Sequence, residues 1–415
     1  MTRSVAIIGA GIVGVTAGLA LLRAGFDVTL FDDDEPGQKA SRWNAGVLAT
    51  SSLVPLNNPG LLSKLPRLAL GQTPGFRIDP ATWRTTLPWA LRFIKVSRGA
   101  VFEETVSALH HLIGRSRNAH LRLLGETGAR HLLIENGWLF LFETEQAFAH
   151  SALQRQIYDR YAVACKVLDK AGLQALEPDL APIFARALWL TESASAIDPH
   201  AVFEVYFKHF MALGGVFRKT KVRNLTRHQD KAAFMDADGT LHRPDHVVVA
   251  AGPWSGDLLA TAALVLPMVS ERGSMRWFSL REGTTLHRPV YDVAGGLVVS
   301  PRPGGIQIST GTQLTTINAP DHPAQLVEAE ARARLILPLA TPLPNKRASA
   351  NRPSLPDSRP AIGPVRSLPG LWLACGHQHI GFSTAPGTAE ILAEQMLGNA
   401  PDAAARPFLP ERFGL

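Results

Sequence analysis

A glycine-rich step near the amino terminus, Gly9-Ala-Gly-Ile-Val-Gly14, constrains this chain more than any other feature. It directly follows Ser4-Val-Ala-Ile-Ile8, an apolar β-branched run that is typical of a strand buried in a parallel sheet. In a strand–turn–helix unit of this kind the first glycine permits the tight turn, the second lets the backbone approach a pyrophosphate, and the third brings helix and strand close together. The motif therefore predicts a nucleotide-binding βαβ unit.

The residues after the glycines continue the same unit. A helix is expected from about residue 13 to Ala24, and Gly25 suits the left-handed conformation that often ends helices. A second strand, 27–31, leads into Asp32, which lies about 20 residues beyond the glycines, where a carboxylate accepts hydrogen bonds from the ribose hydroxyls of an adenosine. We therefore expect a dinucleotide site. NAD and FAD proteins share this unit, so these residues leave the choice between the two cofactors open.

Charge and cysteine content exclude several other kinds of protein. The 42 Lys and Arg against 35 Asp and Glu give a net charge of +7, which suits a nucleic acid, an anionic membrane surface or an acidic small molecule. The basic residues are scattered without a run of five, so no nucleic-acid partner is expected. Cys165 and Cys375 are the only cysteines, too few for a disulfide framework, a four-cysteine zinc site or a redox pair. No metal site is expected.

The uncharged stretch 5–22 superficially resembles a signal peptide. Its four glycines interrupt the apolar helix that such a peptide would form, and no small-residue cleavage site precedes the acidic run 32–35. We therefore predict a soluble cytoplasmic protein. Peripheral contact with the inner face of the membrane stays open, as does the oligomeric state.

A motif after the second predicted strand bears on the choice of cofactor. Ala40-Ser-Arg-Trp-Asn-Ala-Gly46 combines small and hydrogen-bonding residues with a glycine, which suits a backbone that passes closely beneath a flavin. With this motif the chain resembles the FAD-dependent amine oxidoreductases of the D-amino-acid oxidase, glycine oxidase and sarcosine oxidase superfamily. Its Asn-Ala-Gly form is most similar to the bacterial D-amino acid dehydrogenases, and the resemblance extends over nearly the whole chain.

Three later segments also carry the resemblance. Residues 214–217 with Val222 are similar to the segment that lies against the adenine, and residues 245–255 are similar to the strand and glycine motif beside the pyrophosphate. The block 351–383 resembles the family's closing motif. A helix expected to start near Ser383 would direct its amino-terminal N–H groups and positive dipole end toward N1 and O2 of the flavin.

The resemblance implies an α/β fold, α+β overall, with two interleaved domains. A Rossmann-like FAD-binding domain is expected from residues 1–75, 195–262 and 346–415. A substrate domain, built on a largely antiparallel sheet with helices, is expected from residues 76–194 and 263–345.

Local patterns predict some elements of the substrate domain. Leu87, Leu91 and Ile94 have the spacing of an amphipathic helix. Thr341-Pro-Leu-Pro344 is predicted to be a linker where the chain crosses between the domains, and Ile197-Asp-Pro199 is a second candidate. The alternation of apolar residues predicts strands of one antiparallel sheet at 137–142, 296–300 and 305–309.

The resemblance also implies a non-covalently bound FAD. Sarcosine oxidases hold their flavin through a cysteine before the Pro-Asp step, whereas this chain has Ala350-Asn-Arg352 there. The residues at the family's cofactor-binding positions are Gly9, Gly11, Ile12, Val13, Gly14, Asp32, Asp33, Ala40, Ser41, Asn44, Ala45, Gly46, Val47, Val222, Ala251, Gly252, Trp254, Gly376, His377, Ile380, Gly381, Phe382 and Ser383.

The activity implied by the resemblance is oxidation of an amine. The expected substrate is a small amino acid or an N-substituted glycine: a D-amino acid, D-proline, sarcosine, glycine or iminodiacetate. Hydride transfer to flavin N5 would give an imine, which hydrolyses to an oxo acid or aldehyde plus an amine, and O2 or a quinone would accept the electrons. An NAD-dependent dehydrogenase and an FAD-dependent tRNA-modifying enzyme are the alternatives.

Three residues are candidates for contact with the substrate. Arg352 matches the family's carboxylate anchor, and a planar guanidinium holds a carboxylate through two parallel hydrogen bonds. His377 matches the Gly-His step beside the isoalloxazine and is expected to donate to substrate or flavin. For His379, the third candidate, the competing interpretation is a histidine that is bonded within the protein.

Overall fold

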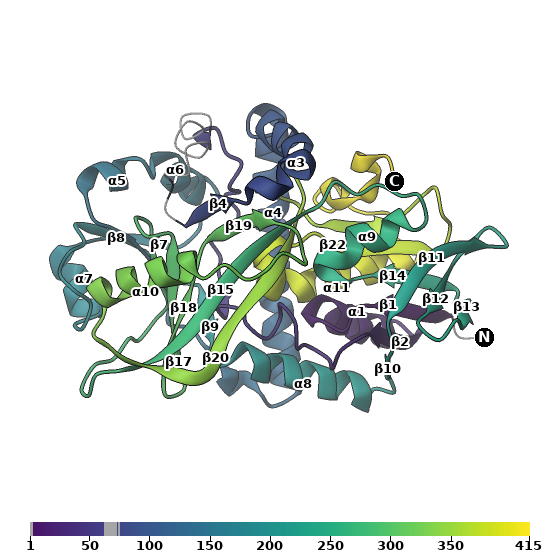
Figure 1. Cartoon of the computed structure of the whole chain (residues 1–415), viewed down its shortest axis with the longest axis horizontal. Helices are drawn as coiled ribbons and strands as arrows, with labels where there is room; N and C mark the ends of the chain where they lie inside the picture. The colour runs from purple at the N-terminus through teal and green to yellow at the C-terminus, as the bar shows by residue number, and fades with distance from the viewer. Residues whose placement is uncertain (1–2, 62–72, 74) are drawn as a thin grey trace.

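The computed structural model describes residues 3–61, 73 and 75–415. Part of the segment 1–75, expected to belong to the FAD-binding domain, thus lies outside the described residues. Two large sheets lie side by side, each with its own helices (Figure 1). This arrangement confirms the predicted α/β fold class.

The first sheet is built around the glycine-rich turn. Its central strand β1 (Ser4–Ile8) pairs in parallel with β2 (Asp27–Asp32) on one side and with β14 (His246–Val249) on the other. The strand order is β10–β2–β1–β14–β22–β21, and its last pair is antiparallel. Strands from the beginning, middle and end of the chain therefore meet in one sheet, and the remaining bounds are β10 (Val216–Lys219), β22 (Leu371–Cys375) and β21 (Ala361–Pro364).

Both faces of the central strands are covered, which explains why β1, β14 and β22 are largely apolar. One face carries a core shared by helices α1 (Ile12–Arg23), α4 (Gly99–Glu126), α8 (Pro199–Ala212) and α11 (Gly381–Met396). The other face packs against α9 (Ser255–Ala260) and a three-stranded meander of β11 (Val222–His228), β12 (Lys231–Asp236) and β13 (Leu241–His242).

Within the described residues the second sheet has ten strands and is largely antiparallel. Its order is β4–β19–β15–β18–β17–β16–β6–β8–β7, and the long strand β20 pairs with β15. The strands predicted at 137–142, 296–300 and 305–309 are confirmed. The bounds are β4 (Phe76–Ile78), β19 (Thr312–Thr315), β15 (Val269–Leu280), β18 (Gly305–Ser309), β17 (Leu297–Arg302), β16 (Val290–Asp292), β6 (Trp138–Phe142), β8 (Arg186–Leu190), β7 (Cys165–Asp169) and β20 (Leu339–Ser354).

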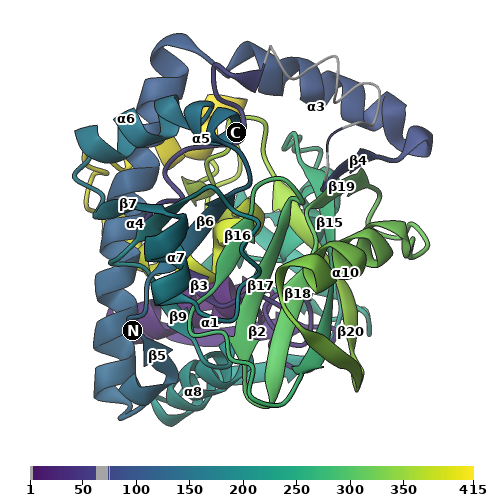
Figure 2. The same cartoon turned by 90° about the vertical axis from the view of Figure 1, so that its left-hand side faces the viewer.

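Helices and a small sheet complete this half of the molecule. Helix α10 (Ala324–Ile336) packs its buried residues against the second sheet, and Figure 2 shows it in front of β18 and β20. The other elements are α3 (Trp83–Lys95), α5 (Glu145–Ala149), α6 (Ala152–Arg160), α7 (Lys170–Leu176) and a three-stranded sheet of β3 (Val47–Leu48), β9 (Ala194–Ala196) and β5 (Leu133–Ile134).

Two local predictions need correction. Residues 341–344 are no linker, because they lie inside β20, where Pro342 pairs with Phe278 beside a register shift; a strand paired on one side tolerates proline. Helix α3 exists, but Leu87 and Leu91 are 50% and 60% exposed, and its buried contacts come from Trp89 instead. The carboxy-terminal helix begins at residue 381, close to the predicted start near Ser383, after a single 3-10 turn.

Among the described helices, none is both long and apolar enough to cross a membrane.

Candidate cofactor and substrate site

A cavity of about 1330 Å³ lies between the two sheets. One part is lined by the glycine-rich turn and the ends of β1 and β2, and another by residues of β15, β17, β19 and β20. Pockets for a single small molecule measure about 300–1,000 Å³. This cavity therefore has room for a dinucleotide together with a small substrate.

The three glycines of the turn are required for different reasons. Gly9 has φ +113°, and a Cβ there would lie 2.3 Å from the carbonyl oxygen of Ala250. A Cβ on Gly14 would lie 1.9 Å from the Gly9 carbonyl oxygen. The protein itself therefore excludes side chains at both positions. A Cβ on Gly11 would meet no backbone atom so closely, since its nearest neighbour would be Ser41 Oγ at 3.2 Å, and Gly11 itself lines the cavity.

The amino terminus of α1 borders this cavity. Gly11 is the N-cap residue, and as a glycine it makes no side-chain capping bond. The Ile12 N–H donates to Ser41 Oγ at 2.9 Å. Free N–H groups and the positive end of the helix dipole make such a terminus a binding site for phosphate groups.

Asp32 lies at the predicted position with a lysine beside it. Its Oδ2 accepts the N–H of Ala10 at 2.8 Å, and its Oδ1 accepts Lys39 Nζ at 2.8 Å. Lys39 also bonds Asp33 and lies 4.7 Å from the ring centroid of Trp254. Burial disfavours the Lys39 charge, but the two carboxylates outweigh this effect and raise its pKa.

A buried arginine, Arg302, holds the backbone of the segment 40–47 in place. Arg302 donates to the carbonyls of Asn44 at 3.2 Å and Ala196 at 3.3 Å. Burial lowers the pKa of Arg302 to about 10. Asn44 Oδ1 accepts the N–H of Gly46 at 2.7 Å, and Ser300 Oγ donates to the Ala45 carbonyl at 3.0 Å. These bonds fix the backbone that was predicted to pass beneath a flavin.

The amino terminus of α11 borders the same cavity. No side chain caps the helix. His377 precedes it, and His377 Nε2 lies 3.0 Å from Thr388 Oγ1 of the helix. Burial lowers the pKa of His377 to about 3, so its imidazole is neutral. His120 holds the helix from behind, with its Nε2 2.9 Å from the Phe382 carbonyl oxygen.

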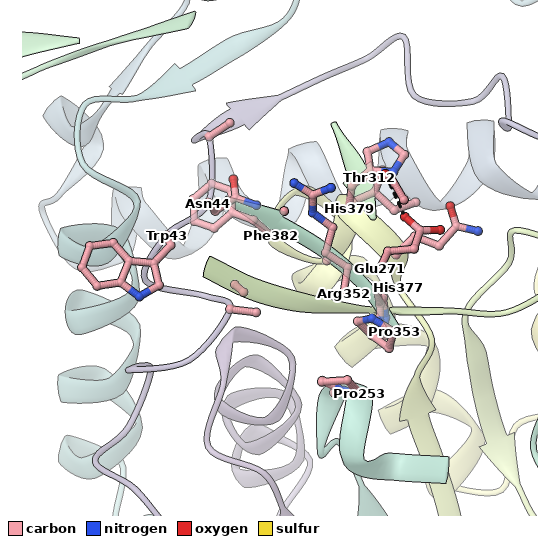
Figure 3. Close-up of a pocket in the computed structure, with 18 of the residues that line it drawn as sticks. Trp43, Asn44, Pro253, Glu271, Thr312, Arg352, Pro353, His377, His379 and Phe382 are labelled. Atoms are coloured by element: carbon pink, nitrogen blue, oxygen red, sulfur yellow. Dashed lines mark hydrogen bonds between the residues drawn. The ribbon is translucent and has the colours of Figure 1, made fainter. Parts of the chain in front are cut away.

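Arg352 lies on the wall formed by β15 and β20 (Figure 3). A Cβ on Gly273 would lie 2.2 Å from Arg352 Nη2, so the guanidinium lies directly over this glycine. Nη1 donates to the Gly311 carbonyl at 3.1 Å. Among the described residues no carboxylate forms an ion pair with it within 4.0 Å. Burial lowers its pKa while the charge of Glu271 opposes this effect, and arginine keeps its charge in proteins.

His379 lies near Arg352, and its exposed side chain lines the cavity. Burial within the surrounding protein, with a smaller contribution from the positive charge of Arg352, lowers the pKa of His379 to about 4. It is therefore a neutral hydrogen-bonding group near physiological pH.

The structure brings most of the predicted site residues together. Gly14, Gly46 and Gly376 do not line the cavity; they pack against the Gly9 carbonyl, Pro199 and Leu355. The predicted residues that line it are Gly9, Gly11, Ile12, Val13, Asp32, Asp33, Ala40, Ser41, Asn44, Ala45, Val47, Val222, Ala251, Gly252, Trp254, Arg352, His377, His379, Ile380, Gly381, Phe382 and Ser383.

The cavity is also lined by polar residues and a glycine that were not predicted, among them Lys39, Glu271, Gly273 and Thr312. Lys39 was recognisable as a cation close to Asp32, the acid predicted to bind a ribose. Glu271 and Gly273 on β15 and Thr312 on β19 gave no such signal, because their position beside Arg352 depends on strand register.

The residues present fit an FAD molecule. Gly11, the amino termini of α1 and α11, and the carboxylate of Asp32 line one cavity. These are the donors and acceptors that two phosphates, a flavin and a ribose require.

Comparisons with known proteins agree with this geometry. The family model described as FAD dependent oxidoreductase matches residues 4–395. A D-amino-acid oxidase of Bradyrhizobium diazoefficiens is 28% identical over 99% of both chains, and a D-amino acid dehydrogenase of the same organism is 24% identical over 99% of this chain and 98% of that protein. The crystal structure of glycine oxidase from Geobacillus kaustophilus has a TM-score of 0.74, with 20% identity and 98% coverage of both chains.

The chain therefore belongs to the FAD dependent oxidoreductase family. It is an FAD-dependent oxidoreductase, and FAD rather than NAD is the cofactor of its amino-terminal unit.

Proposed function

We propose that this protein oxidises the C–N bond of a small amino acid or N-substituted glycine, and that Arg352 anchors the substrate carboxylate. The observation that carries the proposal is the guanidinium of Arg352, which lies in the cavity wall over Gly273 without a carboxylate partner among the described residues. A partly buried charge without a charged partner is costly, and an anionic ligand would relieve the cost.

In the proposed reaction the residues of the chain bind and orient the substrate. Bound FAD supplies the acceptor for a hydride from the substrate. Arg352 would hold the carboxylate by two hydrogen bonds and so set the position of the carbon next to it. His377 and His379 have lowered pKa values and are neutral, so neither adds a charge that competes for the carboxylate.

The relatives support an amino acid as the substrate class. They are named D-amino-acid oxidase, D-amino acid dehydrogenase and glycine oxidase. We propose a D-amino acid, D-proline, sarcosine, glycine or iminodiacetate for this chain, with O2 or a quinone as electron acceptor. The free thiols of Cys165 and Cys375 support a reducing, cytoplasmic setting.

We further propose that FAD is bound without a covalent link. Cys375 is the cysteine that lines the cavity among the described residues, and burial raises its pKa to about 12, so it is a poor nucleophile. Precipitation of the protein with acid should release all flavin into the supernatant. Flavin that stays with the precipitate would contradict non-covalent binding.

Anaerobic mixing of the FAD-loaded protein with a panel of amines tests the proposed reaction. We expect at least one of D-alanine, D-proline, sarcosine, glycine and iminodiacetate to bleach the visible absorbance of the flavin, and L-alanine serves as the stereochemical control. Addition of air or of a soluble quinone to the bleached protein then identifies the acceptor. If none of the panel bleaches the flavin, the proposed function is wrong.

A further inference from the structure

Glu271 is a buried carboxylate in the cavity to which the proposed reaction assigns no role. It is 3% exposed and lies on β15, directly opposite Arg352 on β20. Residues directly opposite each other in an antiparallel pair lie on the same face of the sheet. Both side chains therefore belong to one wall, and both line the cavity.

The two opposite charges are directed apart. The guanidinium of Arg352 leans over Gly273 and donates to the Gly311 carbonyl. The carboxylate of Glu271 accepts Ser354 Oγ and, at 3.4 Å, Thr312 Oγ1. In Figure 3 the guanidinium lies toward Asn44 and the carboxylate toward Thr312. Among the described residues, Glu271 has no cation within 4.0 Å.

This arrangement matches the two charges of an amino acid. A zwitterion carries a carboxylate and an ammonium group on one carbon, and the wall offers a cation and an anion side by side. Two neutral hydroxyl donors compensate a buried carboxylate only in part. The unused hydrogen-bonding capacity of Glu271 therefore suits a cationic ligand group.

We propose that Glu271 binds the amino group of the substrate while Arg352 binds its carboxylate. This inference rests on the proposed function. The ammonium donates N–H hydrogen bonds to the Glu271 carboxylate and passes one proton to it, so that an N–H bond breaks, an O–H bond forms, and both groups become neutral. The substrate then presents the neutral amine that oxidation requires.

The surroundings of Glu271 favour this proton transfer. Burial raises its pKa, and the effect outweighs the opposing contributions of the Ser354 hydroxyl, the Arg352 charge and the Thr312 hydroxyl. A carboxylate with a raised pKa is a better proton acceptor than an exposed one. The competing role is structural, since Glu271 joins β15 to Ser354 of β20 and Thr312 of β19.

Two ligands of almost the same shape separate these roles. 2-Aminoisobutyrate has no hydrogen on its α carbon and cannot be oxidised, and pivalate replaces its amino group by a methyl group. Their dissociation constants are measured by titrating the FAD-loaded protein and following the flavin spectrum. We expect the wild-type protein to bind 2-aminoisobutyrate at least about tenfold more tightly than pivalate, the scale of one charged hydrogen bond.

The variant Glu271→Gln should abolish this preference. We expect the dissociation constant of 2-aminoisobutyrate to rise about tenfold or more. That of pivalate should stay constant or fall, because a negative charge near its carboxylate is removed. Ser354→Ala removes one hydroxyl partner of Glu271 but keeps the carboxylate, so it should retain the preference. Glu330→Gln removes an acid that pairs with Arg276, which lies on the same strand as Glu271. This variant should change neither dissociation constant.

Three results would overturn the inference. One is equal binding of both ligands by the wild-type protein, which decides the matter even if Glu271→Gln does not fold. The second is a Glu271→Gln variant in which the binding of both ligands is weakened equally. The third is a Ser354→Ala variant that no longer prefers 2-aminoisobutyrate. Both of these results would indicate that Glu271 has a structural role. Bleaching of the flavin by the amine panel in the same preparations would show that the proposed function survives such a failure.

Discussion

At the scale of single residues, the site depends on how one guanidinium is placed. Arg352 is one of 42 basic residues, but its position over Gly273 leaves its outer face in the cavity. A charge held in a protein wall binds an opposite charge more strongly than a solvated one, because less water competes. Arg352 should therefore determine affinity for the carboxylate.

Replacement of Arg352 by Met keeps the bulk of the side chain and removes its charge. We expect kcat/KM for the best substrate of the panel to fall about a hundredfold, the scale expected when one partner of a buried charge pair is truncated. The fall should appear mainly in KM, because the guanidinium binds a group that does not react. Steady-state kinetics measure both constants.

Two further variants serve as controls for Arg352. Arg347 lies on the same strand and pairs with Asp321 at the surface, so Arg347→Met should leave both constants unchanged. Gly273→Ala would place a Cβ 2.2 Å from Arg352 Nη2 and should raise KM in the same direction as Arg352→Met. An unchanged KM in Arg352→Met would remove the guanidinium from the substrate site.

At the scale of elements, the β1–turn–α1 unit separates residues needed for folding from residues needed for the cofactor. Gly9 and Gly14 are enclosed by backbone atoms, whereas Gly11 lines the cavity and a Cβ there would have the Ser41 hydroxyl, at 3.2 Å, as its nearest protein atom. One motif thus contains two kinds of constraint. Substitution by alanine distinguishes them, because a methyl group meets protein at one position and ligand at the other.

We expect Gly11→Ala to fold normally and to bind FAD about tenfold more weakly or worse, as when a backbone hydrogen bond to a phosphate is lost. Gly14→Ala should lower the free energy of unfolding by about 1–3 kcal/mol, because its methyl group would overlap the Gly9 carbonyl. FAD titration and thermal unfolding of the apoprotein measure the two effects. A Gly11→Ala apoprotein that unfolds as early as Gly14→Ala would contradict the distinction.

The same contrast explains what the sequence could predict. The β1–α1–β2 unit follows from local patterns, since a strand, three glycines and an acid are adjacent in the chain. The prediction of a linker at Thr341–Pro344 was wrong because a strand paired on one side accommodates prolines that would interrupt a central strand. The pairing of Glu271 with Arg352 joins distant segments, and no local pattern specifies such a register.

The division into two interleaved domains stays a prediction. The strands of the first sheet come from three separate stretches of the chain, as that division requires. The boundary near residue 75 adjoins residues outside the described ones, and sequence patterns place such boundaries poorly because they depend on contacts between distant segments.

At the scale of the whole molecule, buried neutral histidines link stability to pH. His120 is fully buried between α4, α8 and α11, where Nδ1 lies 2.7 Å from Tyr206 Oη and Nε2 lies 2.9 Å from the Phe382 carbonyl oxygen. Burial lowers its pKa to about 4. Burial also lowers the pKa of His377, in the cavity wall, to about 3. An unfolded chain protonates each histidine near pH 6.5, at about the unperturbed value.

The free energy of unfolding should therefore fall as pH falls from about 6.5 to about 4, by about 1.4 kcal/mol per pH unit for each buried neutral histidine. In this window the unfolded chain binds a proton that the folded chain does not, so acid favours unfolding; above it both states are neutral and the contribution vanishes. Urea unfolding of the apoprotein across pH 4–8 measures the slope. The His120→Gln variant should be less stable than the wild-type protein at pH 8. Between about pH 6.5 and pH 4 its free energy of unfolding should fall less steeply, by up to the contribution of one proton, about 1.4 kcal/mol per pH unit. A slope identical to wild type would show that His120 is protonated in the folded protein.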